Sequence, residues 1–113
     1  MPKTGSDLSI NLSAIAYCED GVWIAHCLEL DIVADGADVD DAIKSLISLC
    51  DFQIRTAMEQ GEFGSVFRPA PPEIWAMFAE GRAKLLEEKK PSRRLDCFEA
   101  PVDRFEARQV ACA

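Results

Sequence analysis

The sequence lacks an apolar run long enough to cross a membrane, because charged residues interrupt every hydrophobic stretch well before about 18 residues. Residues 1–15 also lack the basic start and the continuous apolar segment of a signal peptide. From these two absences we expect a cytoplasmic protein that does not bind membranes.

Closely spaced cysteine pairs are absent as well. The five cysteines are an odd number and include no Cys-x-x-Cys pair, which argues against a disulfide framework and against a zinc site. We therefore expect small buried thiols. The cysteines are Cys18, Cys27, Cys50, Cys97 and Cys112.

Basic residues are scarce in the first half of the chain. Residues 1–60 contain eleven acidic and three basic residues, whereas residues 61–113 contain nine of each, so the net charge of -8 arises in the first half. This excess disfavours binding to nucleic acid, whose phosphates it repels. A basic protein is the partner that such a surface would attract, and solubility alone is the alternative explanation.

The hydrophobic pattern of the first 34 residues predicts a small antiparallel sheet. Apolar residues at every second position predict a strand over residues 8–18. The Asp-Gly pair at residues 20–21 is typical of a tight hairpin turn and leads into a second strand over residues 22–28. A short third strand is expected over residues 32–34.

A two-residue turn sets the register of this hairpin, with Cys18 opposite Trp23 and Ala14 opposite Cys27. Cys18 and Cys27 are therefore not cross-strand partners, and a disulfide between them is not expected. Alanine, cysteine and Trp23 line one face, and the other face is also largely apolar. The sheet therefore needs a helix on one side and a second helix or another subunit on the other. The second face carries Ile15, Tyr17, Val22, Ile24, His26 and Leu28.

Two helices are expected after the strands. Asp38 is placed to cap a helix over residues 39–60, which Gly61 ends, and we expect it on the face of small residues. A proline-rich connector follows, and a second helix is predicted from Pro72 to about Lys89. The tail adds one or two strands or crosses the surface.

These elements predict one α+β domain, in which a small antiparallel sheet of three or more strands packs against a long helix, with a second helix and a C-terminal tail. Residues 1–60 form the β-β-β-α part. Residues 61–113 complete the same domain or form an oligomer interface.

The order of these elements, with the motifs inside them, resembles the HicB-like family over about residues 10–60. The motifs are Glu19-Asp20-Gly21-Val22-Trp23-Ile24-Ala25, Cys27-Leu28-Glu29-Leu30, Asp35-Gly36 and Asp38-Val39-Asp40-Asp41-Ala42. The segment from Arg68 to Trp75 is similar to an extension found in a subset of HicB-related proteins.

The resemblance implies an α+β domain that is usually oligomeric. HicB antitoxins neutralise a small basic ribonuclease toxin, HicA, and typically carry a C-terminal DNA-binding segment. Here a proline-rich loop and one further helix follow the first helix, so a DNA-binding segment is not evident. We expect a non-enzymatic interaction domain that is an antitoxin-type partner of such a toxin and self-associates. A solitary HicB-like protein with a nucleic-acid-binding or regulatory role is the alternative.

The candidate site residues follow from this interpretation, which assigns no catalytic residue, cofactor or metal. Partner binding is assigned to Glu29, Asp31, Asp35, Asp38, Asp40 and Asp41. Self-association is assigned to Ile15, Tyr17, Ile24 and Trp75. Two other hypotheses stay open: a small hydrolase that uses His26 with Asp31 or Cys27, and nucleic-acid contact through a basic run. The basic run comprises Lys84, Lys89, Lys90, Arg93 and Arg94.

Overall fold

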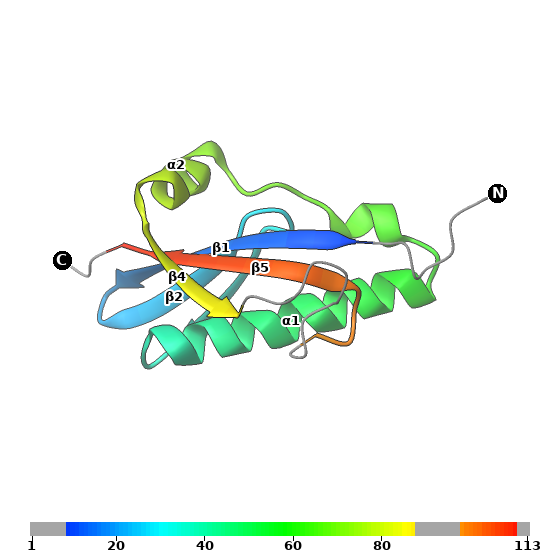
Figure 1. Cartoon of the computed structure of the whole chain (residues 1–113), viewed down its shortest axis with the longest axis horizontal. Helices are drawn as coiled ribbons and strands as arrows, with labels where there is room; N and C mark the ends of the chain where they lie inside the picture. The colour runs from blue at the N-terminus through cyan, green and yellow to red at the C-terminus, as the bar shows by residue number, and fades with distance from the viewer. Residues whose placement is uncertain (1–8, 88–97, 111–113) are drawn as a thin grey trace.

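A sheet with one helix on each face forms the fold (Figure 1). The computed structural model describes residues 9–87 and 98–110. The elements are β1 (Ile10–Glu19), β2 (Val22–Cys27), β3 (Ile32–Gly36), α1 (Val39–Glu59), the 3-10 helix η2 (Phe63–Val66), α2 (Pro72–Glu80), β4 (Arg82–Glu87) and β5 (Val102–Gln109). The α+β prediction is confirmed, with the sheet packed against a long helix and a second helix present.

The β1–β2 hairpin has the predicted register. Cys18 lies opposite Trp23 and Ala14 lies opposite Cys27. Asp20 and Gly21 have φ angles of 54° and 79°, the positive values that a two-residue hairpin turn requires. β3 then pairs antiparallel with the other side of β2.

The sheet continues beyond the predicted strands in the order β3-β2-β1-β5-β4. β5 runs parallel to β1, and β4 pairs antiparallel with β5, so the sheet is mixed. The tail therefore adds a strand beside β1, which was one of the two expected outcomes. Because β5 pairs with the central strand β1, both halves of the chain contribute strands to one sheet.

The second helix is shorter than predicted. It ends at Glu80, and residues 82–87 form β4, so the extension of a helix to Lys89 is wrong. The chain changes from helix to strand at Gly81, where an added Cβ would lie 2.8 Å from Ile15 Cδ1 and 3.1 Å from Arg108 Cβ. A larger residue here would have to displace the Ile15 side chain, so glycine suits this close approach to the sheet. Pairing with β5 then overrides the helical spacing of the residues that follow.

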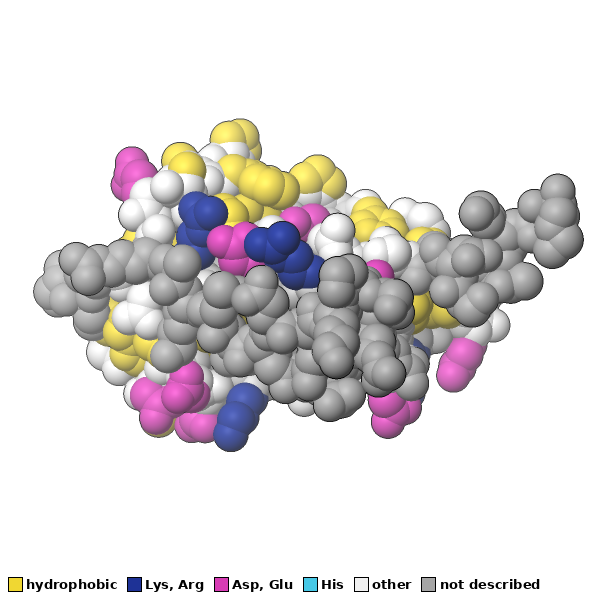
Figure 2. Space-filling view, viewed as in Figure 1, with side chains coloured by type: hydrophobic (Ala, Val, Ile, Leu, Met, Phe, Trp, Pro, Cys, Tyr) yellow, Lys and Arg dark blue, Asp and Glu magenta, His cyan; other side chains and the backbone are white. Residues whose placement is uncertain are grey.

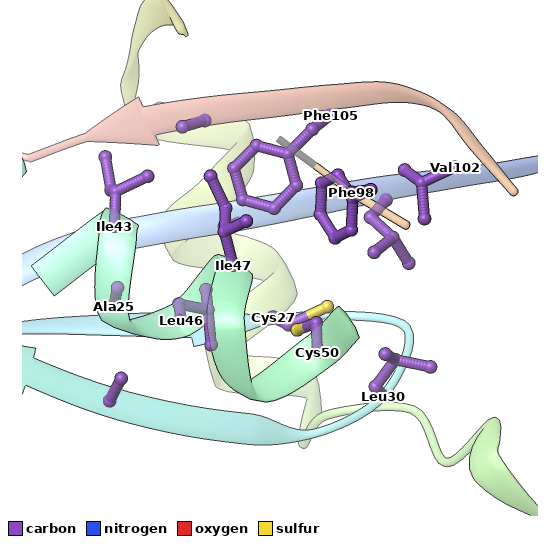
Figure 3. Close-up of a cluster of buried hydrophobic side chains, with 14 of the residues drawn as sticks. Ala25, Cys27, Leu30, Ile43, Leu46, Ile47, Cys50, Phe98, Val102 and Phe105 are labelled. Carbon is purple, nitrogen blue, oxygen red and sulfur yellow. The ribbon is translucent and has the colours of Figure 1, made fainter. Parts of the chain in front are cut away.

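α1 covers the face of small residues, as predicted. The Asp38 carboxylate accepts a hydrogen bond of 2.8 Å from the Asp41 backbone N–H and so caps the helix. Figure 3 shows the core between α1 and the sheet, to which Phe98 and Phe105 contribute a pair of rings 5.8 Å apart. The buried side chains of α1 include Ala42, Ile43, Leu46, Ile47, Cys50 and Ile54.

α2 and the connector before it cover the opposite face. Ile15 and Leu28 are fully buried there against Ala70 and Ile74. Arg108 attaches the end of α2 to the sheet, because its Nη1 donates to the Phe78 carbonyl at 2.9 Å and its guanidinium lies 4.1 Å from the centre of the Phe78 ring. The second cover that the apolar sheet needs is thus a helix of the same chain.

The cysteines depart in part from the expectation of free buried thiols. Cys27 and Cys50 are free and fully buried, and their sulfur atoms point toward each other (Figure 3). The hydrogen bond with Cys27 and the burial raise the pKa of the Cys50 thiol, so this thiol stays protonated. Cys18 is disulfide-bonded, and the prediction is wrong for this residue. Cys97 and Cys112 lie outside the described residues.

Tyr17 provides a test of the packing on the α2 face. Its pKa is raised, first because the phenol is partly buried and second because the Glu19 carboxylate lies nearby. The folded state therefore holds the proton more tightly than the unfolded state. The stability that Tyr17 contributes is complete below the unfolded pKa and is lost as the pH rises through the folded pKa.

Tyr17 is the only tyrosine, so ultraviolet absorbance of the phenolate reports its ionisation alone. We expect the midpoint in the native protein to lie above the midpoint in urea. Replacing Glu19 with glutamine should lower the native midpoint only in part, because burial is the larger cause. Equal midpoints in the native and unfolded protein would contradict this prediction.

Candidate functional site

Four of the six predicted partner-binding residues lie together on the surface, where β3 ends and α1 begins. Asp35 is exposed on β3, and Asp38, Asp40 and Asp41 are exposed at the start of α1. The helix dipole favours negative charge in this first turn, which explains locally why the acids are tolerated side by side. Figure 2 shows acidic side chains gathered at the end of the molecule where α1 begins. The four residues are called the acidic cluster below.

Glu29 and Asp31 lie apart from the acidic cluster, in the turn between β2 and β3. Glu29 Oε1 accepts a hydrogen bond of 2.7 Å from the Ser13 backbone N–H, which ties the turn to β1. Asp31 has a φ of 55°, and its Oδ1 lies 2.6 Å from His26 Nε2. These two carboxylates hold the turn in shape, so they are less available to a partner than the acidic cluster.

The same turn also fixes the connector that leads to α2. The Arg68 N–H donates to the Glu29 carbonyl at 3.0 Å, and the Ala70 N–H donates to the Leu28 carbonyl at 2.8 Å. The turn therefore joins β1, β3 and the connector. The charge of Glu29 predicted a role in partner binding, whereas its carboxylate accepts the hydrogen bond from Ser13, a contact that the sequence does not reveal.

The side chains of His26 and Asp31, which the hydrolase hypothesis combines, are in contact in the structure. His26 is 7% exposed, and its Nδ1 is buried with no hydrogen-bond partner among the described residues. The contact joins a strand residue to a turn residue with positive φ, a conformation that costs about 1 kcal/mol or more for a non-glycine residue. The contact ties the turn to β2.

The structure does not bring His26 together with Cys27. Cys27 faces α1 in the main core, whereas His26 lies on the opposite face of β2, as adjacent residues on a strand must. The Cys27 thiol is fully buried, and its closest acidic contact is Glu29 Oε1 at 3.9 Å. A Cys-His nucleophile pair is therefore not formed.

The structure also contains a feature that the sequence analysis missed, an open groove along β3. Its volume is about 340 Å³. Val33 on β3 is 48% exposed, and Leu49 on α1 is 40% exposed. The lining residues are Ile24, Val33, Ala34, Asp35, Ser45 and Leu49. Leu49 was the one residue in the sequence that could have indicated the groove, because it belongs to the apolar pattern of the helix. Helical spacing alone, however, does not distinguish a residue that lines a groove from one in the core.

The predicted self-association residues occupy different environments. Ile15 is fully buried under α2, so it is not available to a second copy. Tyr17 and Ile24 are half-buried and lie opposite each other in the β1–β2 register. Trp75 is 40% exposed, and its indole Nε1 donates to the Ala70 carbonyl at 3.1 Å. Trp75 is thus the member of the set with the most accessible surface.

The remaining sequence hypotheses concern metals, membranes and the basic run. In residues 9–87 and 98–110, no group of three or more histidine, cysteine, aspartate or glutamate side chains could hold a metal ion. No helix in these ranges is long and apolar enough to span a bilayer. Lys84 belongs to β4, and the rest of the basic run lies outside the described residues.

No family model, curated protein or solved structure matches this chain. The HicB-like resemblance therefore stays a prediction from the quoted motifs.

Proposed function

We propose that this chain is a non-enzymatic, HicB-like protein-interaction domain that acts in the cytoplasm and binds a small basic protein, of the kind that HicA-type ribonuclease toxins represent. The observation that supports the proposal is the exposed acidic cluster beside the open groove of β3. Charge attracts and orients a basic partner, whereas the apolar groove provides area that a partner can bury.

The distribution of cations supports the same partner chemistry. Lys44 is the only basic residue between residues 4 and 54, and it lies one turn beyond the acidic cluster on α1. Few cations of the chain are therefore close in sequence to the cluster. Because like charges repel, binding a basic protein would relieve this repulsion and would also speed association.

Charge reversal in the acidic cluster is the test of the proposal. The variant Asp35→Lys/Asp40→Lys/Asp41→Lys keeps Asp38, whose carboxylate caps α1. A basic protein captured by the wild-type chain from a lysate of its own organism, and identified by mass spectrometry, should bind this variant at least about tenfold more weakly in calorimetry. Wild-type affinity should also fall as salt concentration rises.

The matched control is Glu59→Lys/Glu62→Lys/Glu80→Lys, which changes the net charge equally at exposed positions distant in sequence from the cluster. It should leave the affinity within about twofold of wild type. Equal weakening by both variants, or capture of no small basic protein, would contradict the proposal.

Self-association remains part of the proposal and has its own measurement. Sedimentation velocity at micromolar concentration should detect a dimer or a larger species, and Trp75→Ala should shift it toward monomer, because exposed tryptophan is enriched at interface centres. Wild-type protein that sediments only as a monomer would contradict it.

A further inference from the structure

We infer that the outer edge of β3 accepts an extended basic segment of the partner as an additional strand of the sheet, with apolar side chains of that segment seated in the groove. This inference rests on the proposed function and specifies how the basic partner is held.

The edge of the sheet supplies the first argument. β3 is the terminal strand in the order β3-β2-β1-β5-β4, so no strand pairs with its outer side among the described residues. Natural edge strands are usually protected by lysine, proline or a bulge. β3 has the sequence Ile-Val-Ala-Asp-Gly and pairs with β2 without a register shift, so it contains no lysine, proline or bulge, and Asp35 is its one charged residue. The opposite edge strand, β4, contains Arg82 and Lys84.

The groove supplies the second argument. It lies beside β3, and its lining comes from β2, β3 and α1. At about 30 Å³ for each water molecule in the liquid, a volume of about 340 Å³ holds side chains and not just one ordered water. Strand addition commonly combines backbone hydrogen bonds with pockets for alternate side chains. Exposed apolar side chains are present on both sides of β3, because Val33 shares the His26 face of the sheet and Leu49 belongs to α1 on the other face.

The negative charge near β3 favours a basic segment over a second copy of the chain at this edge. Asp35 lies within β3 and lines the groove, and Asp38, Asp40 and Asp41 follow directly along the chain. A second copy would approach this edge with the same negative charge, because each chain carries a net charge of -8. A segment that alternates basic and apolar residues would instead place cations near the aspartates and apolar side chains in the groove.

The test uses a seven-residue peptide that alternates lysine and valine, together with the same peptide N-methylated at alternate backbone nitrogens. N-methylation removes hydrogen-bond donors and keeps the charge. NMR titration of the full chain should show binding of the plain peptide and at least tenfold weaker binding of the methylated one. The amide groups of Val33 and Asp35 should become more protected from hydrogen exchange when the plain peptide is bound.

Two variants locate the site. Val33→Pro prevents strand addition at the edge, and Leu49→Lys puts a cation into the groove at a 40% exposed helix position that does not disturb the core. Each should weaken the plain peptide at least about tenfold, whereas Phe52→Lys, at a position 57% exposed on α1 but not lining the groove, should not.

Three outcomes would overturn the inference. Equal binding of the two peptides would show attraction by charge alone, which contradicts the added strand and leaves the proposed function standing. Protection of the β3 amides that rises with protein concentration in the absence of peptide would show that a second copy occupies the edge. Binding of neither peptide would overturn the inference that β3 accepts an added strand. The proposed function would still be tested separately, by the effect of charge reversal on binding of the captured protein.

Discussion

Replacing Asp51 with alanine should lower the free energy of unfolding by about 3 kcal/mol, since it removes a buried carboxylate that two backbone groups depend on. Asp51 is 8% exposed. Its Oδ1 accepts hydrogen bonds of 2.8 Å from both the Glu99 and Ala100 N–H groups, and its Oδ2 accepts one of 2.9 Å from Arg55 Nε. Asp51 therefore joins the middle of α1 to the segment that leads into β5.

Two further variants separate the hydrogen bonds from the ion pair. Asp51→Asn retains a carbonyl oxygen for the two N–H groups and should cost only about 1 kcal/mol. Arg55→Ala removes the ion pair and should have a smaller effect than Asp51→Ala, because the Arg55 side chain is 41% exposed and solvent screens the pair.

Urea denaturation followed by tryptophan fluorescence measures all three variants. If Asp51→Ala cost less than Arg55→Ala, the backbone hydrogen bonds would not be the main contribution, and the interpretation of Asp51 as the link to β5 would be wrong.

Asp51 also shows where the sequence pattern stopped being informative. The periodicity of α1 predicted its buried face, and Asp51 lies next to Cys50 within that stripe. A charged residue at a core position indicates a buried acceptor, but its partners are backbone groups 48 and 49 residues further along the chain. Local spacing carries no information about such a distant contact.

Local rules succeeded wherever the determining contacts were local. The Asp-Gly turn and the alternation of small residues predicted the register of β1 with β2, and Asp38 was correctly placed as the cap of α1. The parallel pairing of β1 with β5 was not predictable in the same way, since it joins residues about 90 positions apart. Residues after Gly81 were assigned to a helix for the same reason, because their strand is defined by its partner β5.

The candidate site likewise contains features that local sequence predicts and features that depend on distant contacts. Sequence counting identified six carboxylates, and their local context placed Asp38, Asp40 and Asp41 at the helix start. It could not distinguish these from Glu29 and Asp31, whose partners lie on β1 and β2. The groove was missed because its lining comes from β2, β3 and α1, and no single segment carries its pattern.

Gly36 connects the fold to the proposed interaction surface. It lies at the end of β3 opposite Trp23, and the first turn of α1 packs directly on it. A Cβ atom at this position would lie 2.4 Å from the Ala42 backbone nitrogen and 2.7 Å from Asp41 Cβ. Because real Cβ atoms do not approach other atoms this closely, the helix start would have to move away from β3.

We therefore expect Gly36→Ala to lower the free energy of unfolding by about 2 kcal/mol or more, a typical cost for forcing extra volume into packed structure. Gly64→Ala is the matched control, since a Cβ there meets nothing within 4 Å and should change stability by less than about 0.5 kcal/mol. Thermal and urea unfolding of both variants provide the comparison.

The same substitution should also weaken binding of the basic partner in conditions where the variant is fully folded. Gly36 makes no charge contact, but it sets the distance between Asp35 on β3 and Asp41 on α1, so a displaced helix separates the members of the acidic cluster. Gly36→Ala protein that matched wild type in stability would show that α1 moves without cost. If it matched wild type in partner affinity as well, the spacing of the acidic cluster would not determine recognition.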